Sequence, residues 1–137
     1  QGIGLDAPGN IYAACWIDVS HRIRKITPAG VVTTLAGGGN RGHVDGAGSV
    51  AEFNEPNDVA ADAQGNIYVA DKLNNCIRKI TPAGVVSTLA GGATGGFADG
   101  TATAAEFDQP LAHALPSHHS PSPPIFALSR HPGQRYP

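Results

Sequence analysis

The stretch IRKITPAGVVTTLAGG, residues 23–38, recurs almost unchanged as IRKITPAGVVSTLAGG, residues 77–92. The two copies differ only where Thr33 is replaced by Ser87. Extending the comparison at the same offset of 54 residues, to residues 23–56 and 77–110, gives 22 identical positions out of 34. Such a duplication is typical of proteins in which each repeat is one supersecondary unit that packs against its neighbours.

Upstream of this block the two copies are offset by 56 residues instead. DAPGNIY at residues 6–12 matches DAQGNIY at residues 62–68. The first copy therefore carries two extra residues in the region of Cys15 and Trp16. An insertion there indicates a loop, because connecting loops tolerate changes of length that strands do not.

The third copy that should follow Pro110 is missing. The chain reads LAHALPSHHSPSPPIFALSRHPGQRYP, and only Ala114 and Leu115 resemble the next strand. Residues 116–137 hold six of the eleven prolines and no acidic residue, a composition that buries too little apolar surface to offset chain entropy. An altered reading frame, a retained intron or a fragment boundary would each produce such a break. We predict a first repeat at residues 1–56, a second at 57–115 and a disordered tail at 116–137.

Each repeat is predicted to form four short antiparallel strands. In the second copy, residues 58–62 and 66–71 are β-rich runs joined by AQG, and residues 76–81 and 85–90 are joined by PAG. An aspartate that accepts turn amides and a glycine with positive φ suit the first turn, whereas a proline and a glycine suit the second. The residues given these structural roles are Asp6, Gly9, Asn10, Asp62, Gly65 and Asn66, and Pro28, Gly30, Pro82 and Gly84.

One four-stranded sheet cannot bury its apolar side chains alone and must pack on a neighbour. Radial packing of such sheets gives the β-propeller. We therefore predict an all-β fold with two four-stranded antiparallel blades of a β-propeller, an incomplete ring, and a disordered C-terminal tail. Phe53 and Phe107 recur at equivalent positions and are predicted core anchors between blades. The spacing of the isoleucines in IRKI predicts a bulge or an inward stem of Lys79.

Three segments of the second copy, in their order and spacing, resemble NHL repeats. They are DAQGNIYVAD at residues 62–71, NNCIRKITPAGVVSTLAG at 74–91 and GFADGTATAAEFDQP at 96–110. The resemblance covers Gly2 to about Leu115 and implies a propeller of about six blades in the intact protein. In the first copy CWIDVSHR, residues 15–22, replaces the usual turn between strands, which implies an altered loop.

The resemblance favours an extracytoplasmic location, which the sequence itself leaves open. The chain begins with Gln1 and contains no methionine, so we expect that the start of translation and any signal peptide are missing or were removed.

Residue patterns that would support other functions are weak. GGGNRG at residues 37–42 fits a dinucleotide-binding fingerprint, but no helix is predicted after it, so we read it as a flexible loop. No nucleophile elbow surrounds any serine, and His21, His43 and His113 lack spaced triad partners. Cys15 and Cys76 lie at non-equivalent positions, which argues against a repeated disulfide or metal motif. We expect no enzyme activity, no cofactor and no metal.

Charge and hydropathy limit the classes of partner that the sequence predicts. The repeats up to residue 108 sum to a net charge of −4, which argues against nucleic acid. No apolar run reaches the roughly 18 residues of a membrane helix, so no membrane partner is expected. Because the tight turns share one sheet edge, the longer loops gather on the other, where binding is usually placed. The predicted partner-facing residues are Trp16, Asp18, His21, Arg41, His43, Lys72, Asn74 and Phe97.

These observations favour a non-enzymatic binding or scaffold module that presents loops to a protein or peptide. Self-association that completes a propeller is a second kind of partner that the sequence allows. Two alternatives stay open: support blades of a lyase or lactone hydrolase whose site lies in other blades, and a truncated or mispredicted fragment without independent function.

Overall fold

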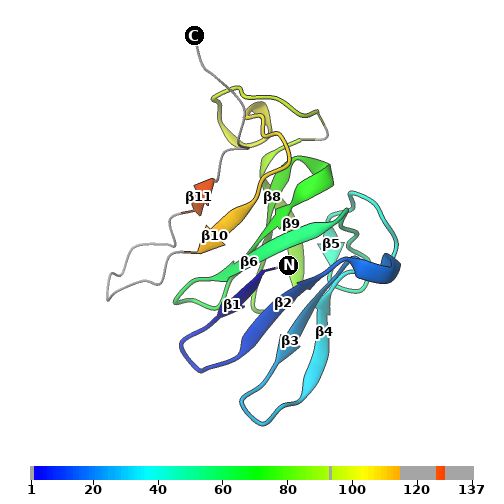
Figure 1. The fold of residues 1–137 in the computed structure, drawn as a ribbon, viewed down its shortest axis with the longest axis vertical. Coiled ribbons are helices and arrows are strands. Elements are labelled where there is room, and N and C mark those ends of the chain that lie inside the picture. Colours follow the sequence, from blue (N-terminus) through cyan, green and yellow to red (C-terminus); the bar gives the residue numbers. More distant parts are fainter. Residues whose placement is uncertain (1, 93, 115–125, 129–137) are drawn as a thin grey trace.

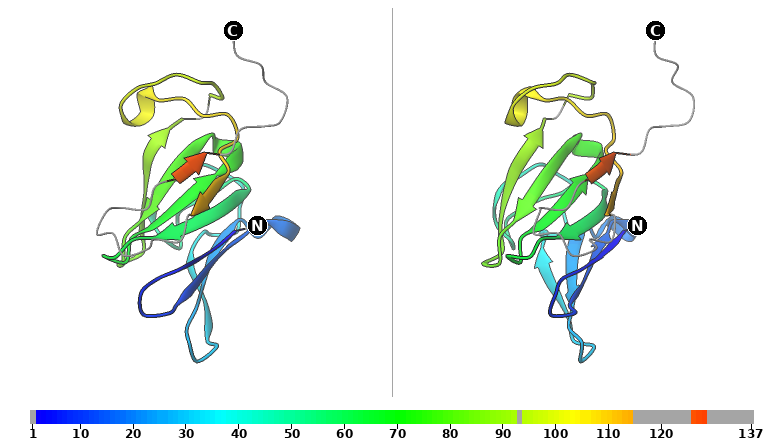
Figure 2. Two further views of the ribbon diagram at one scale, coloured as in Figure 1. Left: turned by 60° about the vertical axis from the view of Figure 1, so that its left-hand side comes forward. Right: turned by 90° about the vertical axis from the view of Figure 1, so that its left-hand side faces the viewer.

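The computed structural model describes residues 2–92, 94–114 and 126–128. Within these ranges the chain is all-β, with strands, turns and three short 3-10 segments but no α-helix. Most strands belong to two antiparallel sheets that lie side by side, as the views in Figures 1 and 2 show. The predicted fold class, two blades of the propeller type, is confirmed.

The first sheet has its strands in sequence order, as expected for a blade. Its short hairpins join neighbouring strands, and a 3-10 segment, η1 (Ile17–Val19), lies in the loop between the second and third strands. The strands, in order across the sheet, are β1 (Ile3–Leu5), β2 (Ile11–Cys15), β3 (Arg22–Ile26) and β4 (Val32–Ala36).

The second sheet repeats this order and gains a fifth strand. Its own strands are β6 (Pro56–Ala61), β7 (Ile67–Asp71), β8 (Cys76–Ile80) and β9 (Val85–Gly91), with η2 (Lys72–Asn74) after β7. The added strand, β5 (Gly46–Ala47), comes from the loop between the blades and pairs with Val86 and Val85 of β9. The loop that follows the first blade therefore pairs with β9, the outer strand of the second blade.

The C-terminal residues begin a further element. β10 (Ala112–Ala114) lies beside β6 and pairs with β11 (Phe126–Leu128), and η3 (Ala102–Ala104) precedes both. The predicted disordered tail covers residues 116–137, of which 126–128 form this strand instead. The rest of that tail lies outside the described residues.

Each tight hairpin of the first kind is organised by one aspartate. Asp62 Oδ1 accepts hydrogen bonds from the backbone N–H groups of Gln64 (2.9 Å) and Asn66 (2.8 Å). Asp62 Oδ2 accepts from the Asn66 side chain (2.8 Å) and the Tyr68 hydroxyl (3.0 Å). Gly65 has φ 84°, which a side chain would strain.

The same arrangement recurs in the first blade. Asp6 accepts hydrogen bonds from the Asn10 backbone and side chain and from the Tyr12 hydroxyl at 2.8 to 2.9 Å. Burial and the Asp6 carboxylate raise the pKa of Tyr12 to about 12. The turns of the two repeats are therefore equivalent in chemistry as well as in sequence.

The main core lies between the two blades. Phe53, fully buried in the connecting loop, belongs to it and is confirmed as a core anchor between the blades. Phe107 is half-buried and packs on Ala70 and Ile77 of the second blade, so its role between blades stays a prediction. The buried members of the main core are Tyr12, Ala14, Ile23, Ala36, Ala51, Phe53, Val59, Ile67, Val69, Ile80 and Val86.

Both IRKI strands carry the predicted bulge. The strand register shifts between Ile23 and Arg24, and again between Ile77 and Arg78. The alternative, an inward stem of Lys79, stays a prediction: Lys79 is half-buried, whereas the neighbouring Arg78 is fully buried. The buried arginine contacts the connecting loop at Val44, Asp45 and Glu52.

We predict that Asp62→Ala lowers the free energy of unfolding by about 1–3 kcal/mol, because it leaves the turn amides and the Tyr68 hydroxyl without their acceptor. Urea unfolding, followed by circular dichroism, measures the change. Burial alone would raise the pKa of Asp62, but hydrogen bonds from Asn66 and Tyr68 hold it below 3.8. The carboxylate therefore contributes stability above that pH, and the contribution is lost as the pH falls through the lower folded pKa.

The matched control for this prediction is Asp108→Ala, which removes an exposed aspartate. It should change stability by less than about 0.5 kcal/mol. An equal loss in both variants, or an acid limb of the stability profile that is unchanged in Asp62→Ala, would contradict the role given to this turn.

Candidate functional site on the loop face

The longer loops lie at one edge of the two sheets, and the tight hairpins lie at the opposite edge (Figure 1). We call the first edge the loop face. It is formed by residues 16–21, 37–55, 72–75, 92 and 94–109.

Hydrogen bonds fix the connecting loop to the second blade. The Asn54 backbone N–H donates to Asp71 Oδ1 (2.7 Å), and Leu73 N–H donates to the Asn54 carbonyl (3.0 Å). The Asn74 side-chain amide donates both to Asp71 Oδ2 (2.8 Å) and to the Gly42 carbonyl (2.7 Å). Asp71 therefore holds η2 and the loop together from one buried position.

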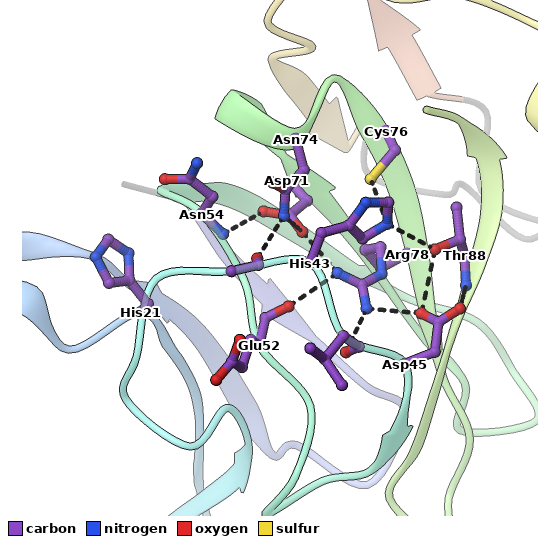
Figure 3. Close-up of polar contacts among 12 residues, drawn as sticks. His21, His43, Asp45, Glu52, Asn54, Asp71, Asn74, Cys76, Arg78 and Thr88 are labelled. Carbon is purple, nitrogen blue, oxygen red and sulfur yellow. Dashed lines mark hydrogen bonds and ion pairs between the residues drawn. The ribbon is translucent and has the colours of Figure 1, made fainter. Parts of the chain in front are cut away.

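A fully buried arginine lies behind this contact (Figure 3). Arg78 Nη1 donates to Asp71 Oδ2 (2.8 Å) and to the Glu52 carbonyl (3.0 Å). Arg78 Nη2 donates to Asp45 Oδ1 (2.7 Å) and to the Val44 carbonyl (2.8 Å). One guanidinium thus joins its own blade to the loop that arrives from the other blade.

The outer end of this network leads to a histidine and a cysteine. Thr88 Oγ1 donates to Asp45 Oδ1 (3.1 Å) and lies 3.1 Å from His43 Nε2, which is 4.0 Å from Cys76 Sγ. Burial raises the pKa of Cys76 to about 12. Because the thiolate is the reactive form, this cysteine lacks the character of a nucleophile at neutral pH.

The first blade replaces one loop residue by a histidine. Asn75 Oδ1 accepts a hydrogen bond from the Gln109 backbone N–H (3.0 Å). At the equivalent place, His21 Nδ1 accepts from the Glu55 N–H (3.2 Å), and both His21 and Asn75 have positive φ. The bond requires an unprotonated Nδ1, so His21 is a structural acceptor in its neutral form.

Two of the residues predicted to face a partner are internal. His21 is 1% exposed and Asn74 is 7% exposed, and both bond to the loop backbone. These two side chains stabilise the loops of the loop face, because their polar atoms form hydrogen bonds within the chain.

The other predicted residues differ in exposure. Phe97 is 65% exposed, and the Arg41 side chain is 59% exposed, with Glu55 at 3.7 Å. Exposed His43 contacts Thr88, as described above. The remaining three are Trp16 and Lys72, which are half-buried, and Asp18, whose side chain lies outside the described part of the structure.

Sequence reasoning missed the buried network itself. Arg24 and Arg78 recur at the offset of 54, as do Asp45 and Asp99, so the signal was an identical charged pair in both copies. Asp71 was harder to find because its counterpart in the first blade is Cys15. Among the described residues, no three His, Cys, Asp or Glu side chains gather closely enough to hold a metal ion.

No helix in the described part of the chain is long and apolar enough to span a membrane.

We predict that His21→Asn removes a pH dependence without removing the bond, since asparagine does the same work at position 75. Burial and the charge of Arg41 lower the pKa of His21 below 6.5. Its contribution to stability is therefore full above that pH and is lost as the pH falls through the folded pKa. Urea midpoints at about pH 7.5 and pH 5 should differ more for the native chain than for His21→Asn.

His21→Ala is the second variant for this test. It should be less stable than the native chain by about 1–3 kcal/mol at neutral pH, because the N–H of half-buried Glu55 loses its acceptor. If His21→Asn kept the native pH dependence, the source of that dependence would lie elsewhere.

Comparison with known sequences identifies one repeat directly and two relatives by name. The NHL repeat family matches residues 53–80. "NHL repeat-containing protein 2" of Bos taurus and that of Homo sapiens are each 44% identical over 72 residues, which is 52% of this chain. The chain spans 10% of the length of these relatives.

Solved structures agree on the fold. A Bacteroides thetaiotaomicron protein of unknown function is 33% identical with a TM-score of 0.66, covering 74% of this chain and 26% of its own. An auxiliary nutrient binding protein from the same organism is 26% identical with a TM-score of 0.65, covering 79% of this chain and 30% of its own.

The family match runs from the Phe53 anchor through β6 and β7 to the end of β8, where Arg78 lies. The repeated strands, the turn chemistry and the named relatives therefore lead to one conclusion: residues 53–80 are an NHL repeat, and the chain is similar to NHL repeat-containing proteins over about half its length, with two adjacent sheets of the β-propeller blade type.

Proposed function

We propose that the chain is a non-enzymatic binding module whose loop face holds a protein or peptide. The observation that carries the proposal is a fixed loop backbone that presents exposed apolar side chains beside a cation. The partner that suits it is a segment with an apolar side chain and a neighbouring carboxylate.

The first support is rigidity. The hydrogen bonds of Asp71, Asn74 and His21 hold the connecting loop and the loop after β2 against the blades. A surface that is ordered before binding loses less conformational entropy when a partner arrives.

The second support is exposure of large apolar side chains. Ile17 is 56% exposed and Val19 is 75% exposed, both within η1. Val19 has φ 60°, a conformation that is unusual for a β-branched residue. Residues held in such conformations cluster at binding and active sites, where the surroundings fix them.

The third support is a cation, Arg41, near the loop that contains η1. Glu55 bonds to His21 at the end of the η1 loop and pairs with Arg41 at 3.7 Å. This contact joins η1 to the loop that carries Arg41. An exposed ion pair of this kind contributes little, so the guanidinium is available to a carboxylate of a partner.

A binding role is also named for one structural relative, the auxiliary nutrient binding protein of Bacteroides thetaiotaomicron. That name supports binding as the kind of function. A protein or peptide, rather than a small nutrient, is favoured here because the apolar residues project from an edge instead of lining a cavity.

The proposal is tested with a displayed library of random peptides selected on the full chain. Selected peptides should combine an apolar residue with Asp or Glu. Their affinity, measured by fluorescence polarisation, should fall at least about tenfold in Val19→Asp and in Arg41→Glu, because each removes one of the two contacts.

The control is Ala83→Asp, which places the same charge on the exposed PAG turn at the opposite edge. Its affinity should equal that of the native chain. Failure to select peptides, or equal losses in Val19→Asp and Ala83→Asp, would overturn the proposal.

A further inference from the structure

A hollow of about 250 Å³ lies between the two blades at the edge of the tight hairpins, opposite the loop face. The first blade lines it with the β1–β2 hairpin, β3 and β4, and the second blade lines it with both of its hairpins. Segments that the structure describes in full therefore form both walls. The hollow belongs to the junction of these two blades.

Part of the lining is apolar. Half-buried Leu35 and buried Ile67 lie at the inner end, and the exposed residues Pro8 and Pro82 lie at the mouth. Pockets for drug-sized ligands usually have volumes of about 300–1,000 Å³, so this hollow suits a smaller molecule. A short aliphatic side chain is the group that such a lining would hold.

The first blade contributes a cation to the hollow. The strand register places Lys25 opposite Tyr12, and the ammonium lies 5.9 Å from the centre of the tyrosine ring. Within the described ranges, Lys25 takes part in no ion pair. Because a lysine ammonium donates hydrogen bonds and accepts none, it can receive a carboxylate from a ligand.

The second blade contributes a hydroxyl group to the same hollow. Thr81 Oγ1 accepts a hydrogen bond from the Val85 backbone N–H (3.2 Å). Its own hydrogen has no acceptor among the described residues, so the hydroxyl can also donate to a ligand. A cation from one blade and a donor from the other thus suit one carboxylate.

A carboxylate lines the hollow as well. Asp6 Oδ2 accepts hydrogen bonds from the Asn10 side chain and the Tyr12 hydroxyl, whereas Oδ1 accepts only from the Asn10 backbone N–H. Burial opposes ionisation of Asp6, but these hydrogen bonds and the charge of Lys25 lower its pKa below 3.8. Oδ1 is therefore charged at neutral pH and has room for a further donor.

The two charges are near each other without forming an ion pair. Lys25 is close enough to affect the pKa of Asp6, yet the two groups make no direct salt bridge. An α-amino acid carries an ammonium and a carboxylate on adjacent carbon atoms. It can place each of its charges against the opposite charge of the protein, so that no charge in the hollow stays unpaired.

We propose that this hollow binds a free α-amino acid with a small aliphatic side chain, such as leucine. Lys25 and Thr81 hold the carboxylate, and Asp6 holds the ammonium. The side chain contacts Leu35, Ile67 and the two prolines. The site lies opposite the loop face, so it is independent of the proposed peptide binding.

The first test is a titration of the full chain with leucine, followed by heteronuclear NMR. The methyl signals of Leu35 and Ile67 should shift, with a Kd of about 1 mM or tighter. Isocaproate lacks the ammonium of leucine, isoamylamine lacks the carboxylate, and glycine lacks the side chain. Each should bind at least about tenfold more weakly, because each loses one of the three contacts.

The duplicated sequence supplies matched variants for the second test. Lys25→Gln should weaken leucine binding at least about tenfold, and Thr81→Val should weaken it at least about threefold. Lys79→Gln and Thr27→Val are the same changes at the equivalent positions, which do not line the hollow. Both controls should bind leucine as the native chain does, although Thr27→Val loses the same turn hydrogen bond as Thr81→Val.

Three results would overturn the proposal. They are no binding of leucine up to about 10 mM, equal affinities for leucine and isoamylamine, and equal losses in Lys25→Gln and Lys79→Gln. Circular dichroism shows whether each variant is folded. If Lys25→Gln is not, the series of leucine analogues on the native chain still decides whether both charges are recognised.

Discussion

The structure depends on one buried guanidinium. Removing the charge of Arg78 from water is costly, and four oxygen acceptors from two carboxylates and two carbonyls offset that cost. Two of these acceptors are main-chain carbonyls of the connecting loop, so the loop cannot leave without exposing a buried charge. The cation also lies 5.1 Å from the Phe53 ring, which ties the polar contact to the core.

Several features of the loop face follow from this constraint. Asp45 must approach Arg78, and the two residues after it are thereby brought alongside β9, where they form β5. Burial raises the pKa of Asp71, whereas the hydrogen bonds from Asn54 and Asn74 and the charge of Arg78 oppose that rise and favour the carboxylate that pairs with the arginine. The contacts to Asn54 and Asn74 also shape the loop above it. The polar cluster thus determines the backbone of the connecting loop, while the apolar core determines how closely the blades approach.

Strands and hairpins were predictable because their determinants are local. In the first hairpin of each blade, the aspartate that begins the turn and the glycine that closes it lie within four residues of one another, so the sequence contains the whole interaction. β5 was not predictable, since Gly46 and Ala47 have no strand pattern. They pair with β9 because the ion pair between Asp45 and Arg78 holds the preceding residue beside that strand. His21 was assigned to the surface because it is a polar residue in a variable loop, yet its ring replaces an asparagine acceptor and is buried. Arg78 was overlooked because a charged residue in a short strand is normally solvated.

The duplicated sequence separates what a segment determines from what its neighbours determine. Sixteen nearly identical residues give the same strands, the same bulge and the same turn in both blades. They do not give the same burial: Val86 is 1% exposed and Val32 is 50% exposed, although both stand in the same local sequence. The difference arises because one blade has a preceding neighbour that supplies a loop and an apolar face, and the other has none among the described residues. Burial, the pairing of the arginine and the form of the outer edge are therefore properties of a junction between two blades, and a single repeat carries only half of the information for each.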